Sequence, residues 1–368
     1  MAGTLEALPV GLGTIDGRAV ERPLRVLAVT PLPSSRASMI HVTRQVASLD
    51  VSGVTCQTFT VASRTAPWVV LREWSRLRRE IRAFQPDIVH AHYGTMTAFL
   101  AILSTARPIM VTYRGSDLNP NRSRGRLREV VGTLLSQIAA LRAARIICVS
   151  NQLKNKLWWR RDRISVIPTG VDMTLFYPRD LQEARRELGW SQDERVVLFN
   201  AGDPIIKRLD LALAGVEFAE SLCGKIRFAA LDGDVPPNSI PLMMSAANCL
   251  LLTSDWEGSP NVVKEALACN LPVVSVDVGD VRERLERVRP SVIVPRDACA
   301  IGKAIFEILQ QGQRSNGRES VTDLSSEVVS QRIVTVYRTL QNEYLKSGSR
   351  FWTRPGHRSF PKRSRVMP

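Results

Sequence analysis

Short apolar runs alternate with segments of helical period along most of the chain, and this alternation restricts the fold more than any other feature. The runs of the first half occupy residues 24–29, 54–61, 87–92, 108–113, 145–150 and 164–168. Helical spacing lies between them, as in residues 67–84, where Pro86 marks the end of the helix. A chain that alternates strand and helix builds a mostly parallel sheet covered by helices on both faces. The sequence therefore predicts an α/β protein with doubly wound sheets.

The pattern starts again after Pro168-Thr169-Gly170-Val171-Asp172, so two such halves are predicted. The strands of the second half are expected at residues 195–200, 226–231, 248–253, 273–276 and 292–294. A chain of 368 residues is also too long for one small core. We expect a mobile leader (1–22), two domains (23–175 and 176–345) and a tail (346–368). The last helix of the second domain can pack back on the first, and the cleft between the domains is the expected active site.

The stretch from Asp255 to Glu265 is the strongest candidate site. It follows the apolar run 248–254 and contains Trp256-Glu257-Gly258-Ser259-Pro260-Asn261-Val262-Val263-Lys264. This is a strand, a tight loop and a helix N-terminus, and open α/β sheets bind ligands at that place. The amide groups and dipole of a helix N-terminus favour an anionic ligand.

The positive charge is concentrated in the first half and the tail. The formal net charge is +15; residues 1–175 hold 24 Lys and Arg against 11 Asp and Glu, and residues 346–368 hold seven against none. Such asymmetry indicates an anionic partner surface, either lipid or nucleic acid. No apolar run reaches the ~18 residues of a membrane span, and residues 1–22 do not resemble a signal peptide, so a cytoplasmic location is expected. The six scattered cysteines form no CxxC pair and do not predict a zinc or disulfide framework.

Four stretches resemble the family 4 retaining glycosyltransferases of the GT-B fold, in which two Rossmann-like domains face a central cleft. Glu257 and Glu265 match that family's E-x7-E motif within EGSPNVVKEALACNLPVVSVDVG. The segment SVIPTGVD (165–172) is similar to its inter-domain segment, and QPDIVHAH (85–92) to one of its first-domain strands. Phe199-Asn200-Ala201-Gly202 through Lys207-Arg208 resembles its diphosphate-binding strand end. The resemblance covers roughly residues 23–345.

The resemblance implies a nucleotide-sugar donor bound by the second domain and an acceptor bound by the first. It places Glu257 at the donor sugar and Glu265 at the ribose hydroxyls. Further donor-binding residues are expected around the diphosphate and sugar: Gly202, Lys207, Arg208, Gly258, Ser259, Pro260, Asn261 and Val262. Where the family usually has an arginine after the glycine, this chain has Asp203, and Arg208 is the expected substitute.

The acceptor side departs further from the family pattern. Arg114 stands where members often carry a histidine, and a guanidinium cannot act as a general base because it stays protonated. Arg114 is expected to steady the leaving diphosphate or an acceptor phosphate, and His92 is the other catalytic candidate. Asp117 and Arg36 are candidate acceptor contacts, with loop and surface roles as the alternatives. The first loop, Ser34-Ser35-Arg36-Ala37-Ser38, lacks the glycines found in many relatives.

No metal or cofactor is expected, and Asp232-Gly233-Asp234 only resembles the DxD metal motif of a different fold. The resemblance implies a retaining, hexosyltransferase-type enzyme of cell-surface polysaccharide or glycolipid synthesis. The basic, Trp-containing segments 67–84 and 154–161 suggest peripheral contact with the inner face of the cytoplasmic membrane and a polyprenyl-diphosphate-linked acceptor. No motif supports a nucleic-acid partner. The alternatives are a nucleotide-sugar epimerase of the same fold and a catalytically weakened binding or scaffold module.

Overall fold

A computed structural model describes residues 23–33, 39–51, 53–62, 66–119, 125–232 and 234–346. The first of its two sheets has six parallel strands in the order β2-β1-β3-β4-β5-β6. These are β1 (Leu24–Pro31), β2 (Val54–Val61), β3 (Ile88–His92), β4 (Ile109–Tyr113), β5 (Arg145–Cys148) and β6 (Ile164–Val166). The three central strands β3, β4 and β5 are almost wholly buried, as their apolar sequences predict.

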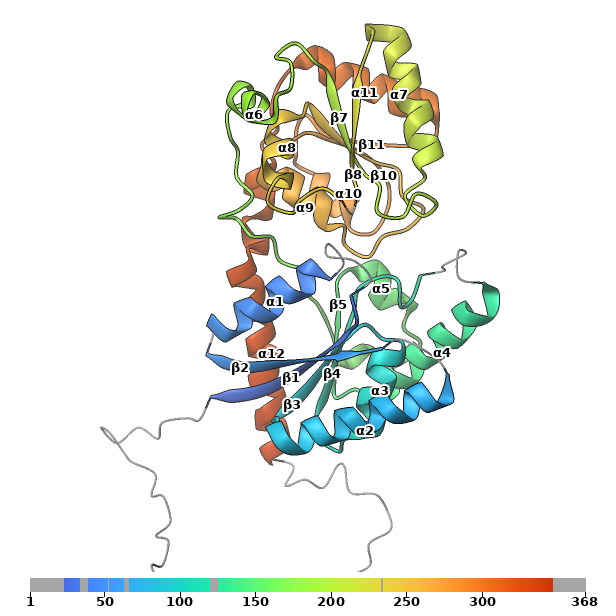
Figure 1. The fold of residues 1–368 in the computed structure, drawn as a ribbon, viewed down its shortest axis with the longest axis vertical. Helices are drawn as coiled ribbons and strands as arrows, with labels where there is room; N and C mark the ends of the chain where they lie inside the picture. Colours follow the sequence, from blue (N-terminus) through green and yellow to red (C-terminus); the bar gives the residue numbers. More distant parts are fainter. Residues whose placement is uncertain are drawn as a thin grey trace, which may run out of the picture.

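Helices cover both faces of this sheet (Figure 1). They are α1 (Ile40–Val51), α2 (Pro67–Phe84), α3 (Met96–Ser104), α4 (Arg126–Arg142), α5 (Asn151–Lys156) and the 3-10 turn η2 (Arg161–Arg163). Helices α2, α3 and α4 pack on one face around a core that contains Leu77, Leu100 and Ala139. Helix α1 lies on the other face.

The second sheet has five parallel strands in the order β11-β10-β9-β7-β8. They are β7 (Val196–Asn200), β8 (Arg227–Leu231), β9 (Cys249–Leu252), β10 (Val273–Val276) and β11 (Val292–Val294). Its helices are α6 (Leu181–Leu188), α7 (Leu209–Cys223), α8 (Ile240–Ala246), α9 (Asn261–Ala268), α10 (Val281–Leu285), α11 (Ala298–Gln311) and the 3-10 helix η3 (Gly317–Leu324). The two parallel α/β halves that the alternation predicts are confirmed.

Helix α12 (Ser326–Lys346) leaves the second domain and runs along the first, beside α1 (Figure 1). Its buried residues Val329, Ile333 and Tyr337 join a core with the first-domain strands. The Tyr337 hydroxyl lies 2.6 Å from Nδ1 of His90 on β3. The two domains are therefore joined twice, by the segment before α6 and by this helix.

The leader (1–22) and tail residues 347–368 lie outside the described residues, so the predictions made for them stay predictions. Within the described part of the chain, no helix combines the length and apolarity that crossing a bilayer requires.

Candidate active site

A cavity of about 520 Å³ lies between the two domains, at the carboxyl ends of both sets of strands. The first domain lines it with residues of α1 and of the loops after β3 and β4, among them His41, Arg44, Tyr93, Arg114 and Ser116. The second domain lines it with Asn200, Gly202, Lys207, Asp232 and the loop 256–262, together with Glu265. The cleft thus contains most of the residues that the sequence predicts for the donor site.

Glu257 and Lys207 form an ion pair on the donor side of the cleft. The Lys207 Nζ lies 2.5 Å from Glu257 Oε1, and both side chains are less than one-fifth exposed. The Ser254 hydroxyl donates to the same carboxylate oxygen at 2.9 Å. The Lys207 backbone is also fixed, because its carbonyl accepts a hydrogen bond from Thr253 at 2.7 Å. The loops after β7 and β9 therefore present an ammonium and a carboxylate side by side, both held in place before any ligand binds.

Gly258 lies at a close contact between the two domains. A Cβ atom at this position would lie 2.0 Å from the backbone carbonyl oxygen of Arg114 in the first domain. Across the contact, Gly115 has φ +138°, which favours glycine, and its own Cβ would lie 3.1 Å from the Gly258 nitrogen. Asn119 adds a hydrogen bond from its side-chain amide to the Glu257 carbonyl at 3.3 Å. The loop 256–262 is therefore packed directly on the first domain.

The rest of that loop leads into helix α9. The Ser259 hydroxyl donates to Asp280 at 2.9 Å, so its oxygen is used within the protein. Pro260 precedes the helix, and Asn261 and Val262 begin it. The first-turn amides of a helix generally lack a partner within the helix, and Asn261 and Val262, which begin α9, both line the cleft. Asn261 Oδ1 is buried without a hydrogen-bond partner in the described part of the chain.

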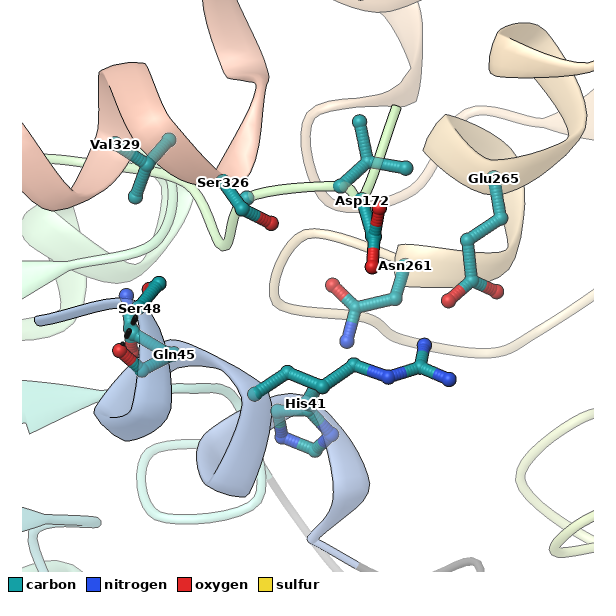
Figure 2. A pocket seen from close by; sticks show the side chains of 11 residues that line it. His41, Gln45, Ser48, Asp172, Asn261, Glu265, Ser326 and Val329 are labelled. Atoms are coloured by element: carbon teal, nitrogen blue, oxygen red, sulfur yellow. Dashed lines mark hydrogen bonds between the residues drawn. The ribbon is translucent and has the colours of Figure 1, made fainter. Parts of the chain in front are cut away.

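Glu265 lies one turn further along α9. Figure 2 shows Asn261 and Glu265 across a pocket from His41 and Gln45 of α1, with Asp172 beside them. Burial raises the pKa of the Glu265 carboxyl, and the positive charges of Arg44 and Lys264 oppose this. The Arg44 guanidinium lies 5.9 Å from the ring centre of Phe176. An arginine of the first domain thus lies near the carboxylate that the resemblance assigns to the ribose.

Arg208 lies outside the cleft lining, although it is next to Lys207 in sequence. It has a left-handed backbone (φ 54°), which turns its side chain away. Its guanidinium binds Asp210 at 2.8 Å and Asp255 at 3.3 Å. Arg208 was expected to replace the arginine that the family usually carries at the position of Asp203, but the structure does not bring its side chain into the cleft. Asp203 itself accepts a hydrogen bond from the Ile206 amide at 3.2 Å.

Arg114 is buried in a network instead of reaching freely into the cleft. Its guanidinium donates to Thr169 Oγ1 at 2.9 Å, to Nδ1 of His92 at 3.1 Å and to the side-chain oxygen of Gln45. Burial lowers its pKa, and the charge of Asp117 works in the opposite direction. An arginine keeps its proton in such a site. Arg114 therefore brings a fixed positive charge to the wall of the cavity.

His92 lies behind Arg114 and does not line the cavity. It is fully buried, and burial and the neighbouring His90, Arg114 and His41 hold its pKa well below the usual range. Because Nδ1 accepts from Arg114, the neutral ring carries its hydrogen on Nε2. That atom has no hydrogen-bond partner within the described residues.

Asp117 holds the loop after β4. Its carboxylate accepts from the backbone amides of Gly94, Arg114 and Gly115 at 2.9–3.3 Å. Burial raises its pKa, and these hydrogen bonds oppose the shift. The sequence left two interpretations of Asp117 open, an acceptor contact and a structural role in the loop. These hydrogen bonds agree with the structural role. Arg36, the other predicted acceptor contact, lies outside the described residues.

Sequence reasoning missed Lys264, which is only 1% exposed. Its ammonium crosses between the domains and donates to the Thr169 carbonyl at 2.7 Å and to Ser259 at 3.0 Å. Its position directly before Glu265, on a helix of otherwise apolar inward residues, is a signal that could have identified it. Arg44 was missed because nothing local distinguishes it from a surface arginine.

Among the described residues, no group of three or more His, Cys, Asp and Glu side chains is arranged to hold a metal ion. Asp232 lines the cleft, and one of its carboxylate oxygens accepts from the Asp234 amide at 3.1 Å. The expectation that no metal or cofactor is needed stays a prediction.

Comparison with known proteins identifies the family. Residues 22–175 match the sequence family Glycosyltransferase Family 4, and residues 190–311 match Glycosyl transferases group 1. A curated relative, the putative teichuronic acid biosynthesis glycosyltransferase TuaC of Bacillus subtilis, is 28% identical over 248 residues. That alignment covers 61% of each chain, so this chain spans about three-fifths of the relative's length.

Solved structures show the same fold at low sequence identity. Sucrose-phosphate synthase from Thermosynechococcus elongatus superimposes with a TM-score of 0.71 at 17% identity, covering 87% of this chain and all of that one. HepE from Anabaena, solved in complex with UDP and glucose, gives 0.62 at 16% identity, covering 88% of this chain and all of that one. The two sequence families together account for most of the chain, which belongs to the group 1 glycosyltransferases of family 4 type and has the GT-B fold.

Proposed function

We propose that this protein transfers a sugar, of hexosyl type, from a nucleotide-sugar donor to an acceptor with retention of configuration. The observation that carries the proposal is the Lys207–Glu257 pair, 2.5 Å apart, at the edge of a cavity that also contains the start of α9 and Glu265. The solved HepE complexes with UDP and with UDP-glucose support a nucleotide-sugar donor for this fold.

In this proposal each donor-side group has a separate task. Lys207 binds the diphosphate, and the first-turn amides of α9 add donors to the same charge. Glu265 accepts hydrogen bonds from the ribose hydroxyls, and Glu257 contacts the transferred sugar. Lys207 is bound to Glu257 in the free protein, so the diphosphate must share or replace that carboxylate. Donor binding then frees Glu257 to turn toward the sugar.

The proposed transfer step keeps the configuration of the anomeric carbon. The acceptor oxygen forms a bond to the anomeric carbon while the bond from that carbon to the phosphate oxygen breaks. The acceptor proton passes to the departing phosphate oxygen, on the same face of the sugar. Arg114 cannot remove that proton, and it supports the step as a fixed positive charge near the developing phosphate charge. No metal or cofactor is part of this proposal.

The acceptor side supports an anionic acceptor. The first half of the chain holds 24 Lys and Arg against 11 Asp and Glu, and Arg44 and Arg114 both line the cavity. A polyprenyl-diphosphate-linked acceptor at the inner face of the cytoplasmic membrane fits this charge. The name of the TuaC relative supports a role in the synthesis of cell-surface polysaccharide.

A binding module without activity is the second candidate, and a specific observation favours it. The Arg114 guanidinium is committed to Thr169, Gln45 and His92, so no group at that position can act as a base. An epimerase of the same fold is the enzymatic alternative.

One experiment separates the three. A panel of nucleotide sugars is screened by thermal shift, since a ligand that binds only the folded state raises the melting temperature. The donor found is then assayed for transfer, epimerisation and hydrolysis with wild type, Glu257→Gln and the control Glu217→Gln. Glu217 is exposed on α7, away from the cleft. Transfer that Glu257→Gln abolishes and Glu217→Gln retains supports the proposal. Interconversion of the sugar without an acceptor indicates the epimerase, and tight binding without turnover indicates the module.

A further inference from the structure

Helix α4 carries apolar side chains on the side that faces solvent. The exposed ones are Leu127, Val130, Val131, Leu134, Ile138 and Leu141, which are between 39% and 78% exposed. Their spacing of three and four residues places them along one side of the helix. A surface helix of a soluble protein normally presents polar residues there. We call these six residues the α4 stripe.

The orientation of α4 is fixed by polar residues that point inward. Ser136 and Gln137 are buried, the reverse of the usual arrangement. The Ser136 hydroxyl donates to the Asp117 carbonyl at 2.9 Å. The Gln137 side chain donates to the Lys156 carbonyl at 3.0 Å and accepts from the Trp158 amide at 3.1 Å. Rotating the helix to bury the stripe would break these hydrogen bonds, so the stripe stays on the surface.

Basic residues lie near the stripe within the described part of the chain. Arg128 and Arg142 belong to α4 itself, and residues 151–163, which contact α4 through Gln137, contain five Lys and Arg and one acidic residue. Trp158 comes from the second segment, lies beside Gln137 and is 56% exposed. From Leu127 to Leu141 the stripe is about 21 Å long, at about 1.5 Å per residue. Apolar residues flanked by cations and an indole are the composition of a helix that lies in a lipid headgroup layer.

We propose that the α4 stripe docks the first domain on an anionic lipid bilayer. Charge decides between the candidate occupants. A symmetric pair of copies would bring the same arginines face to face, and like charges across an interface repel. Tail residues 346–368 hold seven Lys and Arg and no acid, so the tail has the same sign as the stripe's surroundings. Anionic headgroups complement these cations, and the acyl region takes up the apolar side chains.

The stripe is close in the chain to the proposed acceptor side. The loop that begins at Arg114 touches the loop 256–262 at Gly258, and the Ser136 hydroxyl of α4 donates a hydrogen bond to the carbonyl of Asp117 in the same first-domain loop. A bilayer on the stripe would therefore lie next to the domain that the proposed function assigns to the acceptor. The inference extends that proposal, but its test measures lipid binding without sugar transfer, so the two can fail separately.

The docking surface differs from the one that the sequence suggested. In α2, Trp74 donates to the Leu103 carbonyl at 3.1 Å, and Arg76 binds the buried Glu73 at 2.6 Å. Trp74 and Arg76 therefore have their polar partners within the first domain. Trp68 of α2 remains exposed, and Trp158 belongs to the second predicted segment.

Co-sedimentation of the full chain with vesicles tests the proposal. Vesicles of phosphatidylcholine alone are compared with vesicles that contain phosphatidylglycerol. The variant Leu134→Gln/Ile138→Gln changes two exposed positions of the stripe. Its matched control is Leu213→Gln/Leu222→Gln on α7, where the two side chains have nearly the same exposure. Melting temperatures verify that both variants fold.

Wild type and the α7 control are expected to bind the anionic vesicles, and the stripe variant to bind them about tenfold or more weakly, because two apolar side chains no longer leave water. Equal binding by the stripe variant and the control would overturn the proposal, as would equal binding of wild type to both vesicle types. Light scattering in lipid-free buffer adds a second criterion. A wild-type dimer that becomes a monomer in the stripe variant would assign the stripe to self-association instead.

Discussion

Lys264 offers the sharpest test of how the two domains are joined. Its ammonium is buried between them, with the Thr169 carbonyl at 2.7 Å and Ser259 at 3.0 Å as partners. Burial is the main cause that lowers its pKa from 10.5 to about 8. The charges of Asp280 and Glu265 raise the pKa, whereas those of Arg284 and Arg114 lower it further.

The sign of the pH dependence follows from this lowered pKa. Below pH 8 the lysine is charged in both the folded and the unfolded chain, and the folded state carries the full cost of burying the charge. Between about pH 8 and 10.5 the folded protein releases the proton while the unfolded chain keeps it. Stability therefore rises with pH through this window. From pH 7 to pH 10 the expected gain is about 2–3 kcal/mol, from the two pKa values and linkage.

The assay is urea unfolding of wild type, Lys264→Met and Lys303→Met at pH 7, 8, 9 and 10. Methionine fills a similar volume without a charge, so Lys264→Met should lack the gain. Lys303 is exposed on α11, and its variant should follow wild type. The reasoning is refuted if the free energy of unfolding has the same pH dependence in wild type and Lys264→Met.

Three further outcomes are expected. Gly258→Ala places a methyl group 2.0 Å from a first-domain carbonyl oxygen, so turnover should fall by about two orders of magnitude, since displacing the loop 256–262 by an ångström is that costly. The control Gly132→Ala, in helix α4, places a Cβ atom 3.8 Å from the Thr95 side chain, so it should keep activity and gain about 0.5–1 kcal/mol in stability. Lys207→Ala should weaken nucleotide-sugar affinity about tenfold to a hundredfold, measured by calorimetry, because one charge-assisted hydrogen bond to the ligand is lost. Arg208→Ala should change the affinity less than about threefold. Similar losses for both variants would contradict the finding that Lys207 lines the cleft and Arg208 does not. Tyr337→Phe removes the hydrogen bond between α12 and β3 and should lower the free energy of unfolding by about 1–2 kcal/mol, and an unchanged midpoint would show that this contact does not stabilise the docked helix.

The sequence was sufficient for the architecture because the signals are local. Apolar runs such as Cys249–Leu252 predict buried parallel strands whatever surrounds them, and a helix start after such a strand predicts a ligand site. The E-x7-E spacing also depends on one segment only. It places Glu257 in the loop and Glu265 one turn into the following helix, and both line the cleft.

Side-chain direction and inter-domain contact depend on atoms far away in sequence, so only the tertiary structure decided them. Lys207 and Arg208 are neighbours in sequence, but Arg208 has a left-handed backbone. Lys207 lies in the cleft and binds Glu257, whereas Arg208 binds Asp210 and Asp255. His92 is at the end of a strand as predicted, yet Arg114 covers it.

The same holds for Lys264, whose partner Thr169 is 95 residues away. Its burial results from the packing of one domain on the other. The α4 stripe has the helical period expected from the sequence, but that period identifies only an apolar side. Whether this side faces the core or the solvent was decided by the buried hydrogen bonds of Ser136 and Gln137, because a buried polar group must find a partner.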